Sequence, residues 1–338
     1  MSLIRDIRTW AMQTMGIGVG EMFFLVTAKT SADAYYTLLA EKRIPDSKIF
    51  TTLATAEDAM TGSRNDVLFV YPGLHTQITE VGWDKSNTHL VGLGGPNVMG
   101  RNLRPNVMLY ANTAAMGYNL NLTGNNCQFR NIAIQSGTST TDTADATSYG
   151  PMKVNGYGNY FSKVQLRGIN TAKQLAAVAC SSLEISDNGD FPLFEDCIIG
   201  QNTFGGTRTT ASQGHIKFTG TATPSPQNGT FKRCLMLNRT DSDCPMVVNS
   251  AYGGMDRLWL FEDCYFENWS TNWAATAPYV FENSVMIQAS EVRLVNCTAS
   301  GYDQWETTVH GGKWVMTYGA VGVGSAGHMK ISNVAIGS

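Results

Sequence analysis

The segment LWLFEDCYFENW, residues 258–269, contains a phrase that the chain uses twice. Phe261–Cys264 reads F-E-D-C, and Phe194–Cys197 repeats it within FPLFEDCIIGQN, residues 191–202. In both places apolar residues follow the cysteine. Four shared residues are little evidence by themselves. A phrase written twice nevertheless predicts an internal structural repeat, which the rest of the chain can test.

A looser form of this phrase recurs at nearly regular intervals. It consists of an aromatic or aliphatic residue, two polar residues, a small apolar residue, any residue and a final apolar residue. The copies are FRNIAI (129–134), FSKVQL (161–166), FEDCII (194–199), FKRCLM (231–236), FEDCYF (261–266), LVNCTA (294–299) and ISNVAI (331–336). They start 32, 33, 37, 30, 33 and 37 residues apart, which favours a repeat protein.

Each repeat reads as short strands rather than as helices. The copies lack the i, i+3, i+4, i+7 apolar pattern of a helical repeat. A second short apolar segment often precedes the phrase, as in LEIS (183–186), HIKF (215–218), MVVN (246–249), VMIQ (286–289) and WVMTY (314–318). Two or three short strands in every repeat predict a coil of parallel sheets, in which each turn stacks only on its neighbours.

Stacked turns place equivalent residues about 4.8 Å apart, so each position of the phrase becomes a column along the coil. The leading residues predict one column: Phe129, Phe161, Phe194, Phe231, Phe261, Leu294 and Ile331. The small apolar residues predict an inward column: Ile132, Val164, Cys197, Cys234, Cys264, Cys297 and Val334. The four cysteines of this column are therefore expected to be buried, reduced packing residues and not a metal or redox cluster.

The two polar positions of the phrase form columns of alternating charge. One column contains Glu195, Lys232 and Glu262, and the other contains Asp196, Arg233 and Asp263. Alternating charges attract across neighbouring strands, whereas stacked like charges repel. This pattern favours a role in fixing the register of the turns. It disfavours an active site made of these carboxylates, because a cation stands between them in each column.

Residues 49–97, upstream of the repeats, carry a second recognisable pattern. A short helix is expected at roughly residues 51–61, and the sequence D-V-L-F-V-Y-P-G follows at residues 66–73. This arrangement resembles the opening of phage-encoded right-handed parallel β-helix proteins of the pectate-lyase-like superfamily. The resemblance covers residues 49–338 and implies an all-β, right-handed parallel β-helix of about eight or nine turns. Residues 1–48, with a helix expected within residues 31–43, would form a cap or a docking arm.

Composition excludes several functional classes. The 338 residues are 43% apolar and 15% charged, with a net charge of −3 and no basic stripe, so no nucleic-acid partner is expected. No apolar run is long enough to span a membrane, and the first residues lack the compact apolar core of a secretion signal. The seven cysteines show no C-x-x-C spacing, which supports neither a disulfide framework nor a zinc site.

Some side chains remain candidates for chemistry or binding. Asp187, Asp190, Glu195 and Asp196 are near one another in sequence, and paired carboxyl groups catalyse glycoside hydrolysis when suitably spaced. Tyr265, Trp269, Trp273 and Tyr279 are candidates for binding sugar rings or lining a subunit interface. The histidines at 75, 89, 215, 310 and 328 show no pairing with a Ser or Cys nucleophile. Three polar loops, 136–150, 201–214 and 219–230, are expected to project from one flank of the coil.

No catalytic, cofactor-binding or metal-binding residue is assigned from these patterns, and no cofactor is expected. The resemblance implies a non-enzymatic structural protein of a phage virion, such as a capsid decoration, head spike or tail protein, made in the host cytoplasm. We expect a homo-oligomer, most simply a trimer, that contacts other virion proteins through residues 1–48. A host surface glycan is a further possible partner. The alternatives are a tailspike-like depolymerase, acting as a polysaccharide lyase or glycoside hydrolase, and a cell-surface adhesin.

Overall fold

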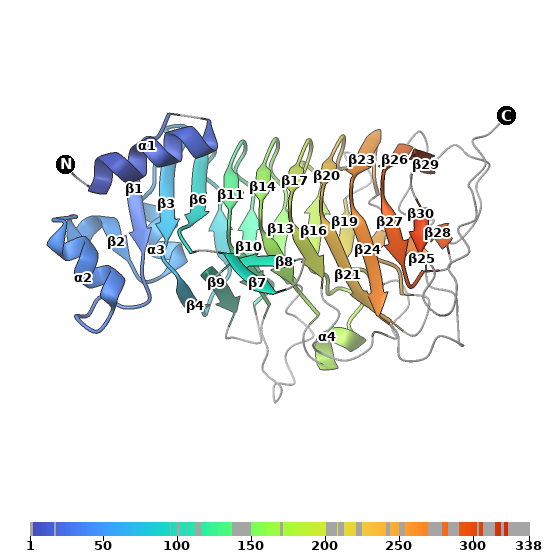
Figure 1. Cartoon of the computed structure of the whole chain (residues 1–338), viewed down its shortest axis with the longest axis horizontal. Coiled ribbons are helices and arrows are strands. Elements are labelled where there is room, and N and C mark those ends of the chain that lie inside the picture. Colours follow the sequence, from blue (N-terminus) through green and yellow to red (C-terminus); the bar gives the residue numbers. More distant parts are fainter. Residues whose placement is uncertain are drawn as a thin grey trace.

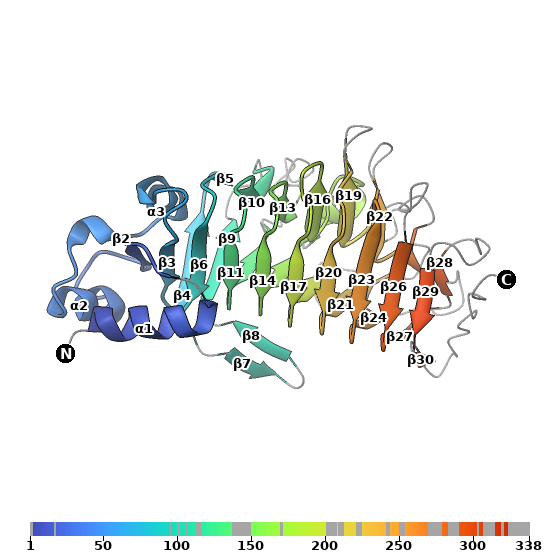
Figure 2. The same cartoon turned by 90° about the horizontal axis from the view of Figure 1, so that it is seen from above.

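The chain winds into a right-handed parallel β-helix, whose strands follow one another along a single long axis in the computed structural model (Figures 1 and 2). The fold class expected from the sequence is therefore confirmed. The structure describes residues 3–16, 18–94, 96–99, 102–105, 107–111, 116–136, 150–169, 172–200, 208, 213–220, 225–240, 244–249, 254–269, 279–282, 291–302, 304–306, 315–318 and 321–323.

Three parallel sheets, called A, B and C here, form the walls of the coil. Sheet A has 11 strands in the order β2 (Ile49–Phe50), β1 (Met22–Leu25), β3 (Asp66–Val70), β6 (Thr88–Gly92), β11 (Gln128–Arg130), β14 (Tyr160–Ser162), β17 (Leu193–Glu195), β20 (Thr230–Lys232), β23 (Leu258–Glu262), β26 (Glu291–Val295) and β29 (Val315–Tyr318).

Sheet B has nine strands: β4 (Gly73–Gln77), β9 (Val107–Ala111), β12 (Ala133–Gln135), β15 (Gln165–Arg167), β18 (Ile198–Gly200), β21 (Leu235–Arg239), β24 (Tyr265–Trp269), β27 (Thr298–Ser300) and β30 (Val321–Val323). Sheet C has eight: β5 (Val81–Trp83), β10 (Tyr118–Leu122), β13 (Gly150–Val154), β16 (Leu183–Ser186), β19 (Ile216–Thr219), β22 (Val247–Asn249), β25 (Tyr279–Phe281) and β28 (Gln304–Glu306). The three sheets have different numbers of strands. The expected count of eight or nine turns is therefore not confirmed.

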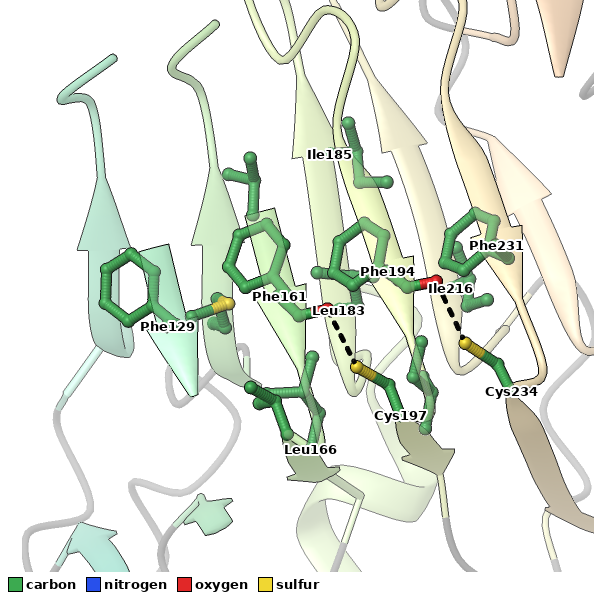
Figure 3. Packing of buried hydrophobic residues seen from close by; sticks show 14 of the residues in the cluster. Phe129, Phe161, Leu166, Leu183, Ile185, Phe194, Cys197, Ile216, Phe231 and Cys234 are labelled. Atoms are coloured by element: carbon green, nitrogen blue, oxygen red, sulfur yellow. Dashed lines mark hydrogen bonds between the residues drawn. The ribbon is translucent and has the colours of Figure 1, made fainter. Parts of the chain in front are cut away.

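The leading residues of the phrase form the expected column inside sheet A. Phe129, Phe161, Phe194, Phe231, Phe261 and Leu294 face one another in successive strands. The ring centroids of the five phenylalanines are 5.5, 4.4, 4.8 and 4.8 Å apart along the column, and the rings are nearly parallel. Figure 3 shows the first four of them, Phe129 to Phe231. All five are fully buried, so each ring contributes both its burial and the stacking on its neighbours.

The column differs from the prediction at its C-terminal end. The strand that pairs with β26 is β29, which places Thr317 opposite Leu294. We expected Ile331 at that place, and we expected residues 314–318 to form the strand that precedes the phrase in another sheet. Both expectations are wrong. β29 pairs with β26 in sheet A, and Thr317 follows Leu294 by fewer residues than one repeat. Ile331, Val334 and residues 286–289 lie outside the described residues.

The small apolar residues of the phrase form the expected inward column at the corner between sheets A and B. Ile132, Val164, Cys197, Cys234, Cys264 and Cys297 are all buried. Each of the four thiols lies 3.3–3.5 Å from the carbonyl oxygen of the phenylalanine one turn earlier, as Figure 3 shows for Cys197 and Cys234. The cysteines are free and buried, as predicted.

The polar residue that precedes this column has a backbone conformation that explains its type. Its φ angle lies between 51° and 56° at Asn131, Lys163, Asp196, Arg233, Asp263 and Asn296. Asn and Asp enter this left-handed region more readily than other non-glycine residues do, because their short side chains bond locally. The turn between the two sheets therefore favours Asn or Asp at this position, in addition to any role of its charge.

Helices close the N-terminal end of the coil (Figure 1). Helix α3 (Leu53–Ala59) was expected near residues 51–61, and its apolar side packs against the inner core. Helices α1 (Leu3–Met15) and α2 (Ala34–Glu41) pack against the outer side of the first strands of sheet A. Strand β1 pairs with both β2 and β3, so sheet A contains residues on both sides of the expected boundary at residue 49.

Three smaller elements complete the fold. The 3-10 helix η1 (Asp46–Lys48) leads into β2, and helix α4 (Ala172–Ala176) lies between β15 and β16. Strands β7 (Pro96–Met99) and β8 (Asn102–Pro105) form an antiparallel hairpin that leaves the coil between β6 and β9.

Replacing Cys264 by Ser should lower the free energy of unfolding by roughly 1–3 kcal/mol, because a hydroxyl would be buried in a place shaped for sulfur. Urea denaturation measures this difference. Cys264→Ala is the matched control, since it removes the sulfur without adding a buried hydroxyl. In native protein few of the seven cysteines should react with a thiol reagent, and all should react after denaturation. A disulfide among the four stacked cysteines would contradict the packing role.

Candidate functional site

The four carboxylates that were candidates for an active site do not converge. Asp187 and Asp190 lie in the turn that leads from β16 of sheet C into β17 of sheet A. Glu195 ends β17, and Asp196 lies in the following turn towards sheet B. The structure therefore separates the four residues into two pairs at opposite ends of one strand.

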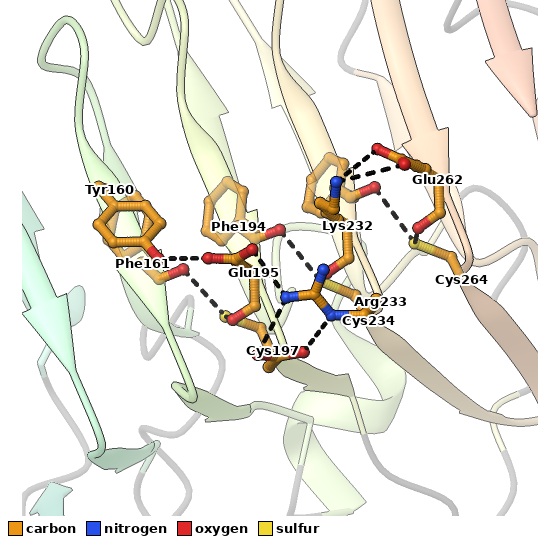
Figure 4. Close-up of polar contacts among 12 residues, drawn as sticks. Tyr160, Phe161, Phe194, Glu195, Cys197, Lys232, Arg233, Cys234, Glu262 and Cys264 are labelled. Atoms are coloured by element: carbon orange, nitrogen blue, oxygen red, sulfur yellow. Dashed lines mark hydrogen bonds and ion pairs between the residues drawn. The ribbon is translucent and has the colours of Figure 1, made fainter. Parts of the chain in front are cut away.

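Glu195 and Asp196 belong to a network that joins neighbouring turns (Figure 4). The guanidinium of Arg233 donates to Glu195 at 2.7 Å and to Asp196 at 2.8 Å. Tyr160, one turn earlier, donates its hydroxyl to Glu195. The hydrogen bond from Tyr160 and the nearby Arg233 hold the pKa of Glu195 below its usual value, so this carboxylate stays ionised and paired.

The alternating charges of the phrase are in the predicted register, although Glu195 does not pair with the cation of its own column. Lys232 faces both Glu195 and Glu262 across the sheet, and its ammonium lies 3.1 Å from the carboxylate of Glu262. Glu195 pairs with Arg233 of the adjacent column. The two charged columns thus act as one cross-linked network, because the longer arginine side chain reaches both carboxylates of the preceding turn.

Asp190 has a different environment at the other end of β17. Its Oδ1 atom accepts a hydrogen bond from the backbone N–H of Gln227 at 2.8 Å, one turn further along the coil. Partial burial raises the pKa of this carboxyl, against the lowering effect of that hydrogen bond. Asp190 therefore helps to hold two turns together through a side chain that is partly exposed.

A serine–histidine pair, which the sequence analysis did not find, is buried inside the coil. Ser182 Oγ lies 2.8 Å from His215 Nδ1, and both residues are at most 1% exposed. The expectation that no histidine pairs with a Ser or Cys nucleophile is therefore wrong. Burial and the nearby Arg208 keep the pKa of His215 well below its usual value. A pair this buried holds two turns together but is closed to a substrate.

Arg208, within the polar segment 201–214, is also buried. Its guanidinium donates to the side-chain oxygen of Asn238 at 2.6 Å and to the backbone oxygens of Gln213 and Pro245. We expected this segment to project from the flank of the coil, but Arg208 anchors it to the interior. The rest of the segment up to residue 212 lies outside the described residues, as do residues 137–149 and 221–224 of the two other polar loops.

Two further histidines are buried in the first turns. His75 lies 2.9 Å from the backbone oxygen of Tyr71 through its Nε2 atom. His89 accepts a hydrogen bond from the backbone N–H of Gln128 through Nδ1, and its Nε2 lies 3.3 Å from the side-chain oxygen of Asn65. Burial lowers the pKa of His89 to about 4, so the ring is neutral near pH 7. The histidines at 310 and 328 lie outside the described residues.

The candidate aromatic residues are dispersed. Trp269 at the end of β24 is 54% exposed, whereas Tyr279 is buried and Tyr265 is half-buried on sheet B. Trp273 lies outside the described residues. Within the described part of the chain, no group of three His, Cys, Asp or Glu side chains is placed to hold a metal ion. No described helix is long and apolar enough to cross a membrane.

The fold, but not the sequence, matches known proteins. No family model and no curated protein matches the sequence. A pectin methylesterase from Erwinia chrysanthemi superposes with a TM-score of 0.53 at 13% identity, over 94% of both chains. ORF18 of Geobacillus virus E2 superposes with a TM-score of 0.52 at 11% identity, over 82% of this chain and 56% of that one. At these identities the similarity establishes the parallel β-helix and leaves the activity open.

Replacing Lys232 by Glu should lower the free energy of unfolding by about 0.5–2 kcal/mol, because carboxylates would face each other in three successive strands. The effect should shrink in 1 M salt, since exposed charges are screened. Urea denaturation at low and high salt measures both quantities. Lys232→Gln is the control, because it removes the cation without stacking a third carboxylate, and it should cost less. An effect that does not depend on salt would contradict the proposed charge column.

His89 should make the protein less stable in acid. Its folded pKa is about 4 and its ordinary value is 6.5, so the unfolded chain binds the proton first as the pH falls. The stability that the neutral His89 contributes is fully present above pH 6.5, falls as the pH drops from 6.5 to 4, and is absent below pH 4. The loss should be roughly 3 kcal/mol, measured by urea denaturation across this range. His89→Asn keeps an acceptor for the Gln128 N–H and should lose this part of the pH dependence; an unchanged profile would contradict it.

Proposed function

We propose that this chain is a non-enzymatic structural protein of a bacteriophage particle, in which the β-helix serves as a rigid rod. The observation that carries the proposal is that the ionisable residues of the repeated phrase form ion pairs between turns. Glu195, Asp196 and Glu262 are paired with Arg233 and Lys232 between turns. Ion pairs between turns occupy these carboxylates, so they are not free to act on a substrate.

The N-terminal region supports a role in assembly. Helix α1 has Trp10 and Met12 on its surface, exposed by 42% and 45%. A hollow of about 340 Å³ lies between this helix and the turn after β6, and Ile7, Trp10 and Leu93 are among its lining residues. An amphipathic helix that leaves apolar side chains and a hollow in solvent is a common attachment point for another protein. Residues 1–48 therefore contact other proteins of the particle.

The phage assignment rests on two similarities. The opening of the coil resembles phage-encoded β-helix proteins, and one structure of similar architecture is encoded by Geobacillus virus E2. The chain is proposed to form a homo-oligomer, most simply a trimer, held partly by an outer face of the coil. A closed cyclic assembly would cover such a face in every subunit.

Sedimentation equilibrium and product assays on the whole chain test this proposal. We expect a homo-oligomer at micromolar concentration. We expect no release of reducing ends, unsaturated ends or methanol from polygalacturonate or methylesterified pectin. A stable monomer would contradict the assembly role. Product release that is lost in Asp187→Asn or Asp190→Asn would show that the protein is an enzyme.

A second experiment tests the attachment region in a phage that encodes the chain. Trp10→Ala combined with Met12→Ala should leave the unfolding temperature unchanged and lower the amount of the protein in purified particles. Deleting residues 1–48 is a poorer test, because Phe23 and Leu25 of β1 are buried in the core. Normal incorporation of the double variant would contradict the proposed contact.

A further inference from the structure

The turns that lead from sheet C into sheet A share one backbone conformation. In five of them the residue three positions before the inward residue of the next strand has a φ angle between 53° and 66°. These residues are Asn87, Asn126, Gly158, Phe191 and Asn228. Asn and Gly are the residues that enter this region most readily. Phe191 departs from the rule.

Phe191 is strained where it stands. A bulky side chain at a φ of 54° is an outlier, because its Cβ approaches the following carbonyl oxygen. Pro192 follows directly, and the residue before a proline normally adopts an extended conformation. Burial does not compensate, since Phe191 is 46% exposed. Strain of this kind, held on the surface, occurs preferentially at functional sites.

A second exposed aromatic residue lies beside Phe191. Tyr157, one turn earlier, is 48% exposed, and the two ring centroids are 5.4 Å apart with 60° between the ring planes. Tyr157 lies four residues before the inward Phe161, at the position that Asn125 occupies one turn earlier and Asp190 one turn later. Two adjacent turns thus present aromatic rings to solvent, whereas the turn before them presents the exposed amides of Asn125 and Asn126.

The turns that carry the two rings also carry hydrogen-bonding side chains. The side-chain oxygen of Asn125 accepts from the backbone N–H of Tyr157 at 2.8 Å, and that of Asn155 accepts from the backbone N–H of Asn188 at 3.1 Å. These bonds use the oxygen atoms and not the NH₂ groups of the two amides. Asp190 adds a carboxylate next to Phe191. Exposed aromatic rings and polar side chains of the same turns therefore share one stretch of the coil surface.

We propose that Tyr157 and Phe191 form a binding site for a neutral polysaccharide. A pyranose ring has an apolar C–H face that stacks on an aromatic ring, and a rim of hydroxyl groups that bond to amides and carboxylates. Two rings are too small for the core of a stable protein–protein interface, which buries about 800 Å² on each partner. The nearby Asp187 and Asp190 disfavour an acidic polysaccharide, because like charges repel.

Affinity electrophoresis of the native protein tests the site. The gels contain β-glucan, dextran, mannan or, for comparison, polygalacturonate. We expect retardation in at least one neutral polysaccharide and less in polygalacturonate. Phe191→Asn is the decisive variant, because Asn126 and Asn228 occupy the same position in other turns. It should raise the unfolding temperature by relieving strain and weaken binding roughly tenfold, a change of about 1.4 kcal/mol.

Two variants complete the design. Tyr157→Asn copies the residue at the equivalent position, Asn125, and should also weaken binding. Trp269→Ala removes an exposed aromatic side chain from sheet B and should leave binding unchanged. Four results would overturn the inference: no retardation of the native protein in any neutral gel, full binding by Phe191→Asn, a lower unfolding temperature of that variant, or a change in its oligomeric state. The last would identify the pair as a protein interface.

Discussion

The stacking of one phenylalanine on the next along sheet A is the contact on which the coil depends. Each turn is too short to enclose a core of its own, so its inward residue must be covered by the turns on either side. The rings from Phe129 to Phe261 meet this requirement at centroid distances of 4.4–5.5 Å. The corner between sheets A and B packs against this stack. Each buried thiol there approaches the carbonyl oxygen of the phenylalanine one turn earlier.

A coil built this way has an open end, and the N-terminal segments cover it. Helix α3 closes the inner core, while α1 and α2 cover the outer side of the first strands of sheet A. Without such cover the first strand would expose its apolar residues and its unpaired backbone groups. The same helices leave Trp10 and Met12 in solvent, so the region that closes the fold is also the surface that we propose for assembly.

The axial order of the fold and the corner between sheets A and B were predictable from the sequence, whereas contacts made by connections of irregular length were not. The phenylalanine and cysteine columns are visible because stacking demands the same kind of residue in every turn. The position of Thr317 was missed because it is polar and lies closer to the preceding copy than the repeat length. The Ser182–His215 pair and the anchor at Arg208 were missed because connections of irregular length bring those residues together. Sequence patterns report positions that recur, and these contacts occur once.

A double-mutant cycle on the phenylalanine column measures the central interaction directly. Phe194→Leu and Phe231→Leu change adjacent rings, whereas Phe129→Leu and Phe261→Leu change rings that never touch. If stability is transmitted from turn to turn, the adjacent pair should show a coupling energy of about 0.5–1.5 kcal/mol. The distant pair should be additive within about 0.5 kcal/mol. Equal coupling in both pairs, or none in the adjacent pair, would contradict the dependence of the coil on neighbouring rings.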